Sequence, residues 1–188
     1  MSCGKIDLRC TKCRLWKKRT QVVPGHGPCS AGLVFVGEAP GRDEDIKGKP
    51  FVGRGGKVLD EALEDARISR ESVYVTNIVK CRPPDNRKPR KDEVRTCTGL
   101  YLESELSAIR PTVICALGQT AAEYFLGTRV KMADTVGHEI SLTIGGGATR
   151  LYVAFHPAAS LHQRKNLEAF RRQISCVAKA AGLTPSTR

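Results

Sequence analysis

Four of the eight cysteines in the sequence have a spacing that suits a metal or iron–sulfur site. Cys10 and Cys13 form a C-x-x-C pair, whereas Cys81 and Cys97 bracket a basic loop and the expected start of a helix. Four thiolates from two distant segments can hold a [4Fe–4S] cluster or a tetrahedral zinc ion. Zinc ribbons usually combine two close pairs. Because Cys81 and Cys97 are far apart in the chain, the spacing favours the cluster.

The other four cysteines are expected to be unpaired. The N-terminal residues Met1–Asp7 contain no apolar stretch, so no secretory signal is expected there, which predicts a cytoplasmic protein with reduced thiols. A disulfide framework is the weaker interpretation. Cys115, in the middle of an apolar run, is expected to be a small buried hydrophobic residue, and Cys3, Cys29 and Cys176 are expected to be free.

Further candidates for chemistry follow short apolar runs. These runs have the length and composition of strands buried on both faces of a parallel sheet: 32–37, 73–77, 112–117 and 151–155. Ligands bind at the carboxyl ends of such strands. The rule selects four segments rich in glycine, proline and polar residues: Glu38–Asp45, Asn77–Arg90, Gly118–Thr120 and His156–Arg164.

Three side chains in or near these segments have distinct chemical uses. The amide of Asn77 offers both a donor and an acceptor, as reading a base edge requires. Phe51 lies between glycine-rich turns and can stack on a flat ligand, although core packing is the usual fate of phenylalanine. His156 precedes a proline and is expected to face a cleft, with a packed, hydrogen-bonded histidine as the alternative.

The GEAPG turn at 37–41 is expected to expose backbone N–H groups to a ligand. It lacks the lysine of a P-loop and the spacing of a dinucleotide-binding turn, so it gives little support to nucleotide triphosphate binding. Glu38 and the acidic run Asp43–Asp45 can orient water or stabilise a cationic transition state. For most of these carboxylates a solvated acidic loop is the preferred interpretation.

The elements that must position these residues alternate along the chain. Helices are expected at 55–67, at about 92–109, from Gly118 onward and at about 165–181. Three prolines exclude a helix or a central strand in the loop 81–90. The alternation predicts an α/β layered fold with a mostly parallel sheet, and segment 135–145 is a candidate for an extra strand or hairpin.

Length and composition set outer limits. The chain has 188 residues, of which 40% are apolar and 27% charged, and its formal charge is +12. These values predict one soluble domain, residues 1–188. No apolar run approaches the roughly 20 residues of a membrane span. The positive charge favours a polyanionic partner such as DNA, RNA or an anionic membrane without selecting one.

Taken together, these segments resemble the family-4 uracil-DNA glycosylases, the iron–sulfur branch of the uracil-DNA glycosylase superfamily. The resemblance covers about residues 8–180. Its motifs occur in the family order: CTKC at 10–13, GEAPGRDED at 37–45, GKPFVG at 48–53, TNIVKCRPP at 76–84, Cys97, and HPA at 156–158. It implies a three-layer α/β/α sandwich with a central, mostly parallel four-stranded sheet. It also implies excision of uracil from single- and double-stranded DNA, with no metal or cofactor taking part in the chemistry.

The resemblance further implies one structural [4Fe–4S] cluster held by Cys10, Cys13, Cys81 and Cys97. The cluster would tie the N-terminal segment 1–32 to the loop 82–90, which the resemblance places near DNA. The expected partner is uracil-containing DNA, bound by a monomer that does not associate with membranes. A replication clamp as a further partner leaves no mark in the sequence.

The resemblance also implies roles for individual residues. Two residues are expected to be catalytic, Glu38 by holding the attacking water and His156 by stabilising negative charge on uracil O2, and Glu44 or Asp45 could share the work of Glu38. The residues expected to bind uracil are Gly37, Ala39, Gly41, Phe51 and Asn77. The residues expected to bind DNA are Arg82, Arg87, Leu161 and Arg164, with Leu161 filling the gap left by a flipped base.

Other interpretations stay open at this stage. A glycosylase of the same superfamily could accept a broader range of deaminated bases, and the cysteines alone also fit a zinc ribbon. A non-catalytic iron–sulfur module that binds nucleic acid would not need Asn77, Phe51 and His156 together. The branch that binds uracil-DNA covalently carries, by resemblance, a basic insertion ending in histidine, and residues 54–90 contain no histidine.

Overall fold

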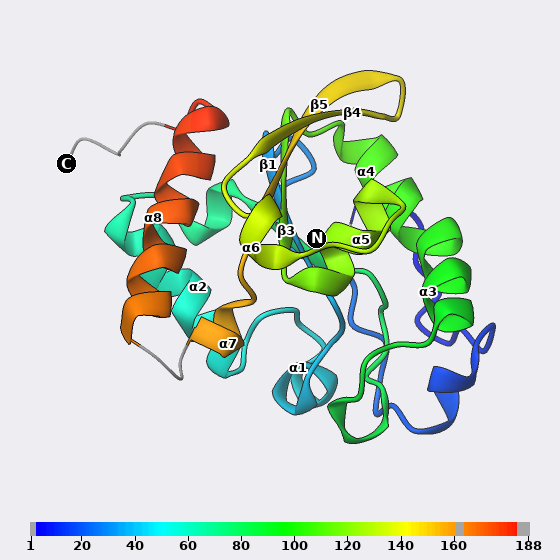
Figure 1. The fold of residues 1–188 in the computed structure, drawn as a ribbon. Coiled ribbons are helices and arrows are strands. Elements are labelled where there is room, and N and C mark those ends of the chain that lie inside the picture. Colours follow the sequence, from blue (N-terminus) through cyan, green and yellow to red (C-terminus); the bar gives the residue numbers. More distant parts are fainter. Residues whose placement is uncertain (1–2, 161–163, 184–188) are drawn as a thin grey trace.

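The computed structural model of the protein describes residues 3–160 and 164–183. Its centre is a five-stranded sheet formed by β1 (Leu33–Gly37), β2 (Tyr74–Asn77), β3 (Val113–Leu117), β4 (Glu139–Ile144) and β5 (Gly147–Ala154). The strand order is β2-β1-β3-β5-β4 (Figure 1). All neighbouring pairs are parallel except β4 and β5, which are antiparallel. The predicted mostly parallel sheet is confirmed, but the prediction of four strands is wrong.

The fifth strand, β4, comes from the segment 135–145. Its residues alternate between exposed and half-buried, as expected for an edge strand with one face in water. It forms a hairpin with β5 in which Ile144 lies opposite Gly147. A strand of this kind lacks the continuous apolar run that identifies the four buried strands, which is why the sequence prediction is one strand short.

Helices cover both faces of the sheet (Figure 1). One face carries α2 (Arg54–Asp65) and α8 (Arg164–Ala180). The other carries α3 (Lys91–Cys97), α4 (Glu103–Ile109) and α5 (Gln119–Leu126). Three further α-helices are short: α1 (Arg42–Lys47), α6 (Met132–Thr135) and α7 (Pro157–Ser160). Short 3-10 helices span Arg14–Lys17 and Arg70–Ser72. The three-layer α/β/α sandwich is therefore confirmed. Among the described residues, no helix is both long and apolar enough to cross a membrane.

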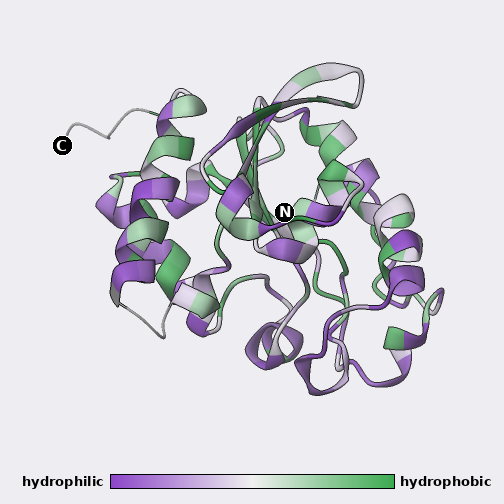
Figure 2. Cartoon of the chain, viewed as in Figure 1, coloured by the Kyte–Doolittle hydropathy of each residue, from purple (hydrophilic) through white to green (hydrophobic). Residues whose placement is uncertain are grey.

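Strand β1 shows how the sequence generates these layers. Successive side chains of a strand point to opposite faces of the sheet. Leu33 and Phe35 accordingly pack in the cluster beneath α2 and α8, whereas Val34 and Val36 pack in the cluster beneath α4 and α5. All four are fully buried. Figure 2 shows hydrophobic residues along the strands and hydrophilic residues around α1.

Two local features differ from the sequence prediction. The helix expected at about 92–109 begins at Lys91 and is interrupted directly after Cys97 by a π-helical stretch, Thr98–Leu102. Single π-turns inside α-helices are often found at functional sites. The loop 81–90, in which no helix is expected, contains one short 3-10 turn, Pro84–Asn86. Proline occupies its first position, where no backbone N–H is needed.

Cys3 and Cys29 form a disulfide, so the prediction that both are free thiols is wrong. The N-terminal segment folds back onto the sheet, where the backbone N–H of Cys3 donates to the hydroxyl of Tyr74 at 3.2 Å. The bond joins positions 26 residues apart, a long-range pairing that local sequence does not indicate. As predicted, Cys115 is free and fully buried and Cys176 is free. Cys176 is exposed.

Candidate active site

A cleft of about 670 Å³ lies at the carboxyl edge of the sheet. It is lined by the segments that follow β1, β2, β3 and β5, together with the first turn of α2, because parallel strands end at the same edge. The structure brings the following predicted site residues together in its lining: Glu38, Ala39, Gly41, Phe51, Asn77, Arg87 and His156.

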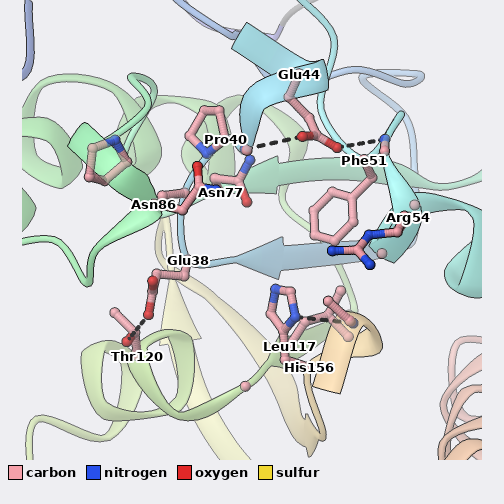
Figure 3. Close-up of a pocket in the computed structure, with 18 of the residues that line it drawn as sticks. Glu38, Pro40, Glu44, Phe51, Arg54, Asn77, Asn86, Leu117, Thr120 and His156 are labelled. Carbon is pink, nitrogen blue, oxygen red and sulfur yellow. Dashed lines mark hydrogen bonds between the residues drawn. The ribbon is translucent and has the colours of Figure 1, made fainter. Parts of the chain in front are cut away.

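Phe51 and Asn77 lie side by side in the cleft (Figure 3). Their exposed fractions are only 7% and 3%. Gly37, at the end of β1, lies next to both residues. A Cβ atom at Gly37 would come within 2.5 Å of Asn77 Oδ1 and 2.6 Å of Phe51 Cζ. The missing side chain of Gly37 therefore makes room for the two side chains that line the cleft.

The backbone of Phe51 is itself unusual. Its φ of 55° lies in the left-handed region, which is costly for a bulky residue and persists only where the surroundings enforce it. Gly56 in α2 makes this possible, because a Cβ there would lie 1.9 Å from the carbonyl oxygen of Phe51. The start of α2 is thus packed directly against the backbone that presents the Phe51 ring.

His156 follows β5 and is held in one orientation. Its Nδ1 accepts a hydrogen bond from the backbone N–H of Ala158 at 3.2 Å (Figure 3). Burial lowers the pKa of His156, and the nearby Glu38 and Glu44 carboxylates oppose this only in part. The imidazole is therefore neutral at pH 7. Because Nδ1 is an acceptor, the proton resides on Nε2, which makes Nε2–H a hydrogen-bond donor in the cleft lining.

The lowered pKa of His156 predicts a pH dependence of stability. In the unfolded chain His156 has its ordinary pKa of about 6.5, whereas in the folded protein its pKa is lower. The contribution of His156 to the free energy of unfolding is therefore fully present above pH 6.5 and is lost on acidification. We expect the free energy of unfolding to fall more between pH 7.5 and 5.5 in the wild type than in His156→Gln. Urea titrations at both pH values measure the difference, and equal losses would contradict the buried neutral histidine.

Glu38 is oriented by a residue that sequence analysis did not assign. Its Oε2 accepts a hydrogen bond of 2.5 Å from the hydroxyl of Thr120, in the first turn of α5 (Figure 3). Each carboxylate oxygen can accept more than one hydrogen bond, so this contact fixes the group without saturating it. Thr120 belongs to the strand-end segment selected from the sequence, but nothing in the sequence pairs it with Glu38.

The acidic run after Glu38 is not a solvated loop, so that interpretation is wrong. It forms α1, and the Glu44 carboxylate accepts hydrogen bonds from the backbone N–H groups of Gly41, Val52 and Gly53 at 3.1, 3.0 and 2.8 Å. Asp45 is buried and accepts from the backbone N–H of Thr20 at 2.9 and 3.0 Å. Both carboxylates are engaged in joining chain segments around the cleft.

Removal of the Glu44 carboxylate is expected to destabilise the cleft wall. Glu44→Ala leaves three backbone N–H groups without their acceptor, which should lower the free energy of unfolding by about 1–3 kcal/mol. Asp43→Ala, at an exposed neighbouring position in α1, should change it by less than about 0.5 kcal/mol. Urea denaturation of both variants checks this, and equal effects would argue against the bridging role.

Two of the predicted DNA-binding arginines lie in the loop that follows β2, and both already have partners within the protein. Arg87 donates to both carboxylate oxygens of Glu93 at 2.7 and 2.8 Å, and Arg82 Nε donates to Asn86 at 2.8 Å. Arg54, which sequence analysis did not single out, lines the cleft beside Phe51 (Figure 3) and forms no ion pair with any residue that the structure describes. Leu161 and the side chain of Arg164 lie outside the described residues.

The four cysteines with predicted ligand roles line a second, smaller pocket: Cys10, Cys13, Cys81 and Cys97. Two of their sulfur atoms accept hydrogen bonds. Arg19 Nη1 donates to Cys81 Sγ and the backbone N–H of Lys80 donates to Cys97 Sγ, each at 3.2 Å. Such donors stabilise thiolate charge on metal ligands.

The chemistry of these thiols fits an iron–sulfur cluster. Burial raises the pKa of Cys81 to about 11 and that of Cys97 to about 12, so both are protonated at neutral pH unless a metal replaces the proton. Among the described residues, no group of three or more His, Cys, Asp or Glu side chains lies close enough together to hold one metal ion. Four thiols around one pocket are a donor set that a [4Fe–4S] cluster can use.

Residues 24–177 match the family model described as the uracil DNA glycosylase superfamily. The chain belongs to this superfamily. A type-4 uracil-DNA glycosylase of Archaeoglobus fulgidus is 42% identical over 179 residues, which cover 93% of this chain and 89% of the relative. One of Thermotoga maritima is 43% identical over 159 residues, or 84% and 81% of the two chains. A type-5 uracil-DNA glycosylase of Pyrobaculum aerophilum is 31% identical over 133 residues, or 71% and 56%.

The similarity to type-4 proteins extends over most of both chains, so the predicted membership of the type-4 branch is confirmed. Uracil-DNA glycosylases are hydrolases of DNA repair, and the predicted enzyme class is confirmed with the family. Among the cleft residues to which sequence analysis gave no role are Thr120 and Arg54. Arg54 directly follows the GKPFVG motif, which is the one signal that could have pointed to it.

Proposed function

We propose that the protein hydrolyses the N-glycosidic bond of uracil in single- and double-stranded DNA and leaves an abasic site. The observation that carries this proposal is that Phe51, Asn77, His156 and Glu38 line one cleft. They supply a stacking surface, an amide, a neutral hydrogen-bond donor and a carboxylate, which are the groups that base excision needs. The names of the relatives, type-4 uracil-DNA glycosylases, support uracil in DNA as the substrate.

Access to the bond requires that the nucleotide leave the helix. The C1′ atom of a stacked nucleotide is hidden, so the base must be flipped out, at a cost of a few kcal/mol. The cleft volume of about 670 Å³ is large enough for a base with its sugar. Contacts between phosphates and the exposed Arg42 and Arg54 at the cleft offset the cost of flipping.

Uracil would be selected by its hydrogen-bonding edge. In the proposed complex its ring stacks on Phe51, Asn77 Nδ2 donates to O4 and Asn77 Oδ1 accepts from N3–H. Cytosine presents a donor where uracil has O4 and a bare N3 where uracil has N3–H. The buried amide of Asn77 would then face two mismatched groups, which is costly in a desolvated site.

Bond cleavage places charge at two positions. The C1′–N1 bond breaks with its electron pair going to uracil, so negative charge grows on O2 while the sugar becomes oxocarbenium-like. The Nε2–H of His156 donates to O2, and its orientation is fixed in advance by the Ala158 contact. Glu38, held by Thr120, orients the water whose oxygen bonds to C1′, and it accepts the proton that this water releases.

We assign the cluster a structural role. Bound by Cys10, Cys13, Cys81 and Cys97, it would join the N-terminal segment to the loop and helix that follow β2. The group supplies an electron-transfer centre when bound, but hydrolysis of a glycosidic bond transfers no electrons. In the proposed reaction Glu38 takes the proton that the water releases and His156 stabilises the charge on O2, while uracil departs as an anion that takes its proton from solvent.

The proposal is tested by single-turnover cleavage of an oligomer that carries one uracil, followed by alkali to break the abasic site. Single-stranded and duplex substrates are compared, with cytosine at the same position as the matched control. Cleavage at uracil alone is the expected result. No cleavage by iron-loaded protein that still retains DNA would overturn the proposal and favour a binding module, and cleavage at hypoxanthine or xanthine would widen the substrate range.

A further inference from the structure

A buried ion pair lies between the cleft and the cysteine pocket. Lys80 and Glu105 are both 0% exposed, and Lys80 Nζ is 2.6 Å from Glu105 Oε2. Burying two charges costs several kcal/mol per ion, which their attraction often fails to recover. An apolar pair of similar volume would fill the same space. The ion pair therefore requires an explanation other than stability.

The ammonium group of Lys80 holds the end of β2. Besides Glu105, its Nζ donates to Thr76 Oγ1 at 2.5 Å and to the backbone carbonyl oxygen of Asn77 at 2.8 Å. An ammonium has three protons, and all three have partners here. The carbonyl of Asn77 belongs to the residue whose side chain lines the cleft, so Lys80 fixes the backbone that aims this amide.

Glu105 is anchored just as completely. Its Oε1 accepts from the hydroxyl of Tyr74 and the backbone N–H of Gly25, both at 3.1 Å, and its Oε2 also accepts from Thr76 Oγ1 at 2.9 Å. Glu105 thereby connects Lys80 to α4, β2 and the segment before β1. A fully connected buried polar network of this kind is rigid and leaves its members few alternative positions.

The same lysine also touches the cysteine pocket. Its backbone N–H donates to Cys97 Sγ, and the next residue is Cys81. One residue therefore contacts both the end of the base-reading strand, through its side chain, and the proposed cluster ligands, through its backbone.

We propose that Lys80 is a positioning residue that sets the direction of the Asn77 amide and so supports rapid excision of uracil. This inference rests on the proposed reading of uracil by Asn77. A displacement of about 1 Å at a group that binds the reacting base lowers the rate about a hundredfold. The benefit of a rigid anchor can therefore offset the free energy lost in desolvating the ion pair.

A double-mutant cycle separates positioning from simple structural support. The variant Lys80→Met/Glu105→Gln removes both charges and keeps side-chain volume, so no unpaired buried charge remains. Single-turnover uracil cleavage should fall about 10- to 100-fold in the wild-type background. In an Asn77→Ala background the same change should lower the cleavage rate by less than about twofold, because the amide through which Lys80 acts is already absent. Iron content and affinity for uracil-free DNA should be unchanged.

Ile174→Ala is the matched control, since Ile174 is fully buried in α8 on the opposite face of the sheet. It should lower stability and leave the uracil cleavage rate unchanged. Equal losses in the wild-type and Asn77→Ala backgrounds would overturn the positioning role. If the charge-free variant does not fold, Thr76→Val removes one acceptor of Nζ and gives the same cycle with both charges present. A wild type that does not cleave uracil would refute the proposed function instead.

Discussion

His156→Ala is expected to slow the single-turnover release of uracil by about 10²- to 10³-fold, the usual cost of deleting one donor to a developing oxyanion. The variant loses the Nε2–H group whose orientation the backbone N–H of Ala158 fixes. Affinity for uracil-free DNA should hardly change, because in the proposed complex His156 contacts the base and not the phosphates. Rapid-quench cleavage of a uracil oligomer and a DNA-binding titration measure the two quantities.

His138→Ala provides the matched control for this prediction. His138 is exposed and does not line the cleft, so its removal should leave the cleavage rate at the wild-type value. If His156→Ala lowered DNA affinity as much as the cleavage rate, the histidine would be a binding or folding residue rather than one that stabilises the transition state.

Cys97→Ala should have the largest effect on the protein itself. It removes a proposed cluster ligand and also the sulfur that accepts the backbone N–H of Lys80. Metal binding free energy contributes to folding free energy in sites of this kind, so we expect loss of iron, a lower thermal midpoint and reduced solubility. Iron analysis and the visible absorption of the purified protein provide the first measurement, and thermal unfolding the second.

Cys176→Ala is the corresponding control, because Cys176 is exposed and lies in α8, outside the cysteine pocket. Its iron content and thermal midpoint should equal those of the wild type. Full iron content in Cys97→Ala would show that the ligand set contains another residue. Zinc in place of iron in the wild type would replace the cluster with a zinc site held by the same thiols.

The parts of this fold that sequence predicts well are those with a local signal. The four parallel strands are continuous apolar runs that stop at glycine, proline or a polar residue, so both the strands and the edge where they end can be read directly. Asn77 stands out because it ends such a run, and His156 because it directly follows one. Strand β4 has only an alternating, half-exposed pattern, and for that reason it was not counted.

The contacts that the sequence missed join residues that residue types alone do not pair. Thr120 meets Glu38 across 82 positions, and the disulfide joins Cys3 to Cys29. Glu44 looked like part of a solvated loop because the backbone N–H groups that it accepts from cannot be seen in a string of residue types. Each of these contacts is created by the fold and has no local pattern of its own.

The space beside Gly37 limits how the base pocket can evolve. Any side chain at this position would run into both the carboxamide of Asn77 and the ring of Phe51, so replacement can only displace them. Glycine is already the smallest residue, which means that no substitution at position 37 can enlarge the pocket either. Variants that accept bulkier damaged bases must therefore carry substitutions in the other walls of the pocket. At position 37, glycine preserves the pocket and any other residue disrupts it.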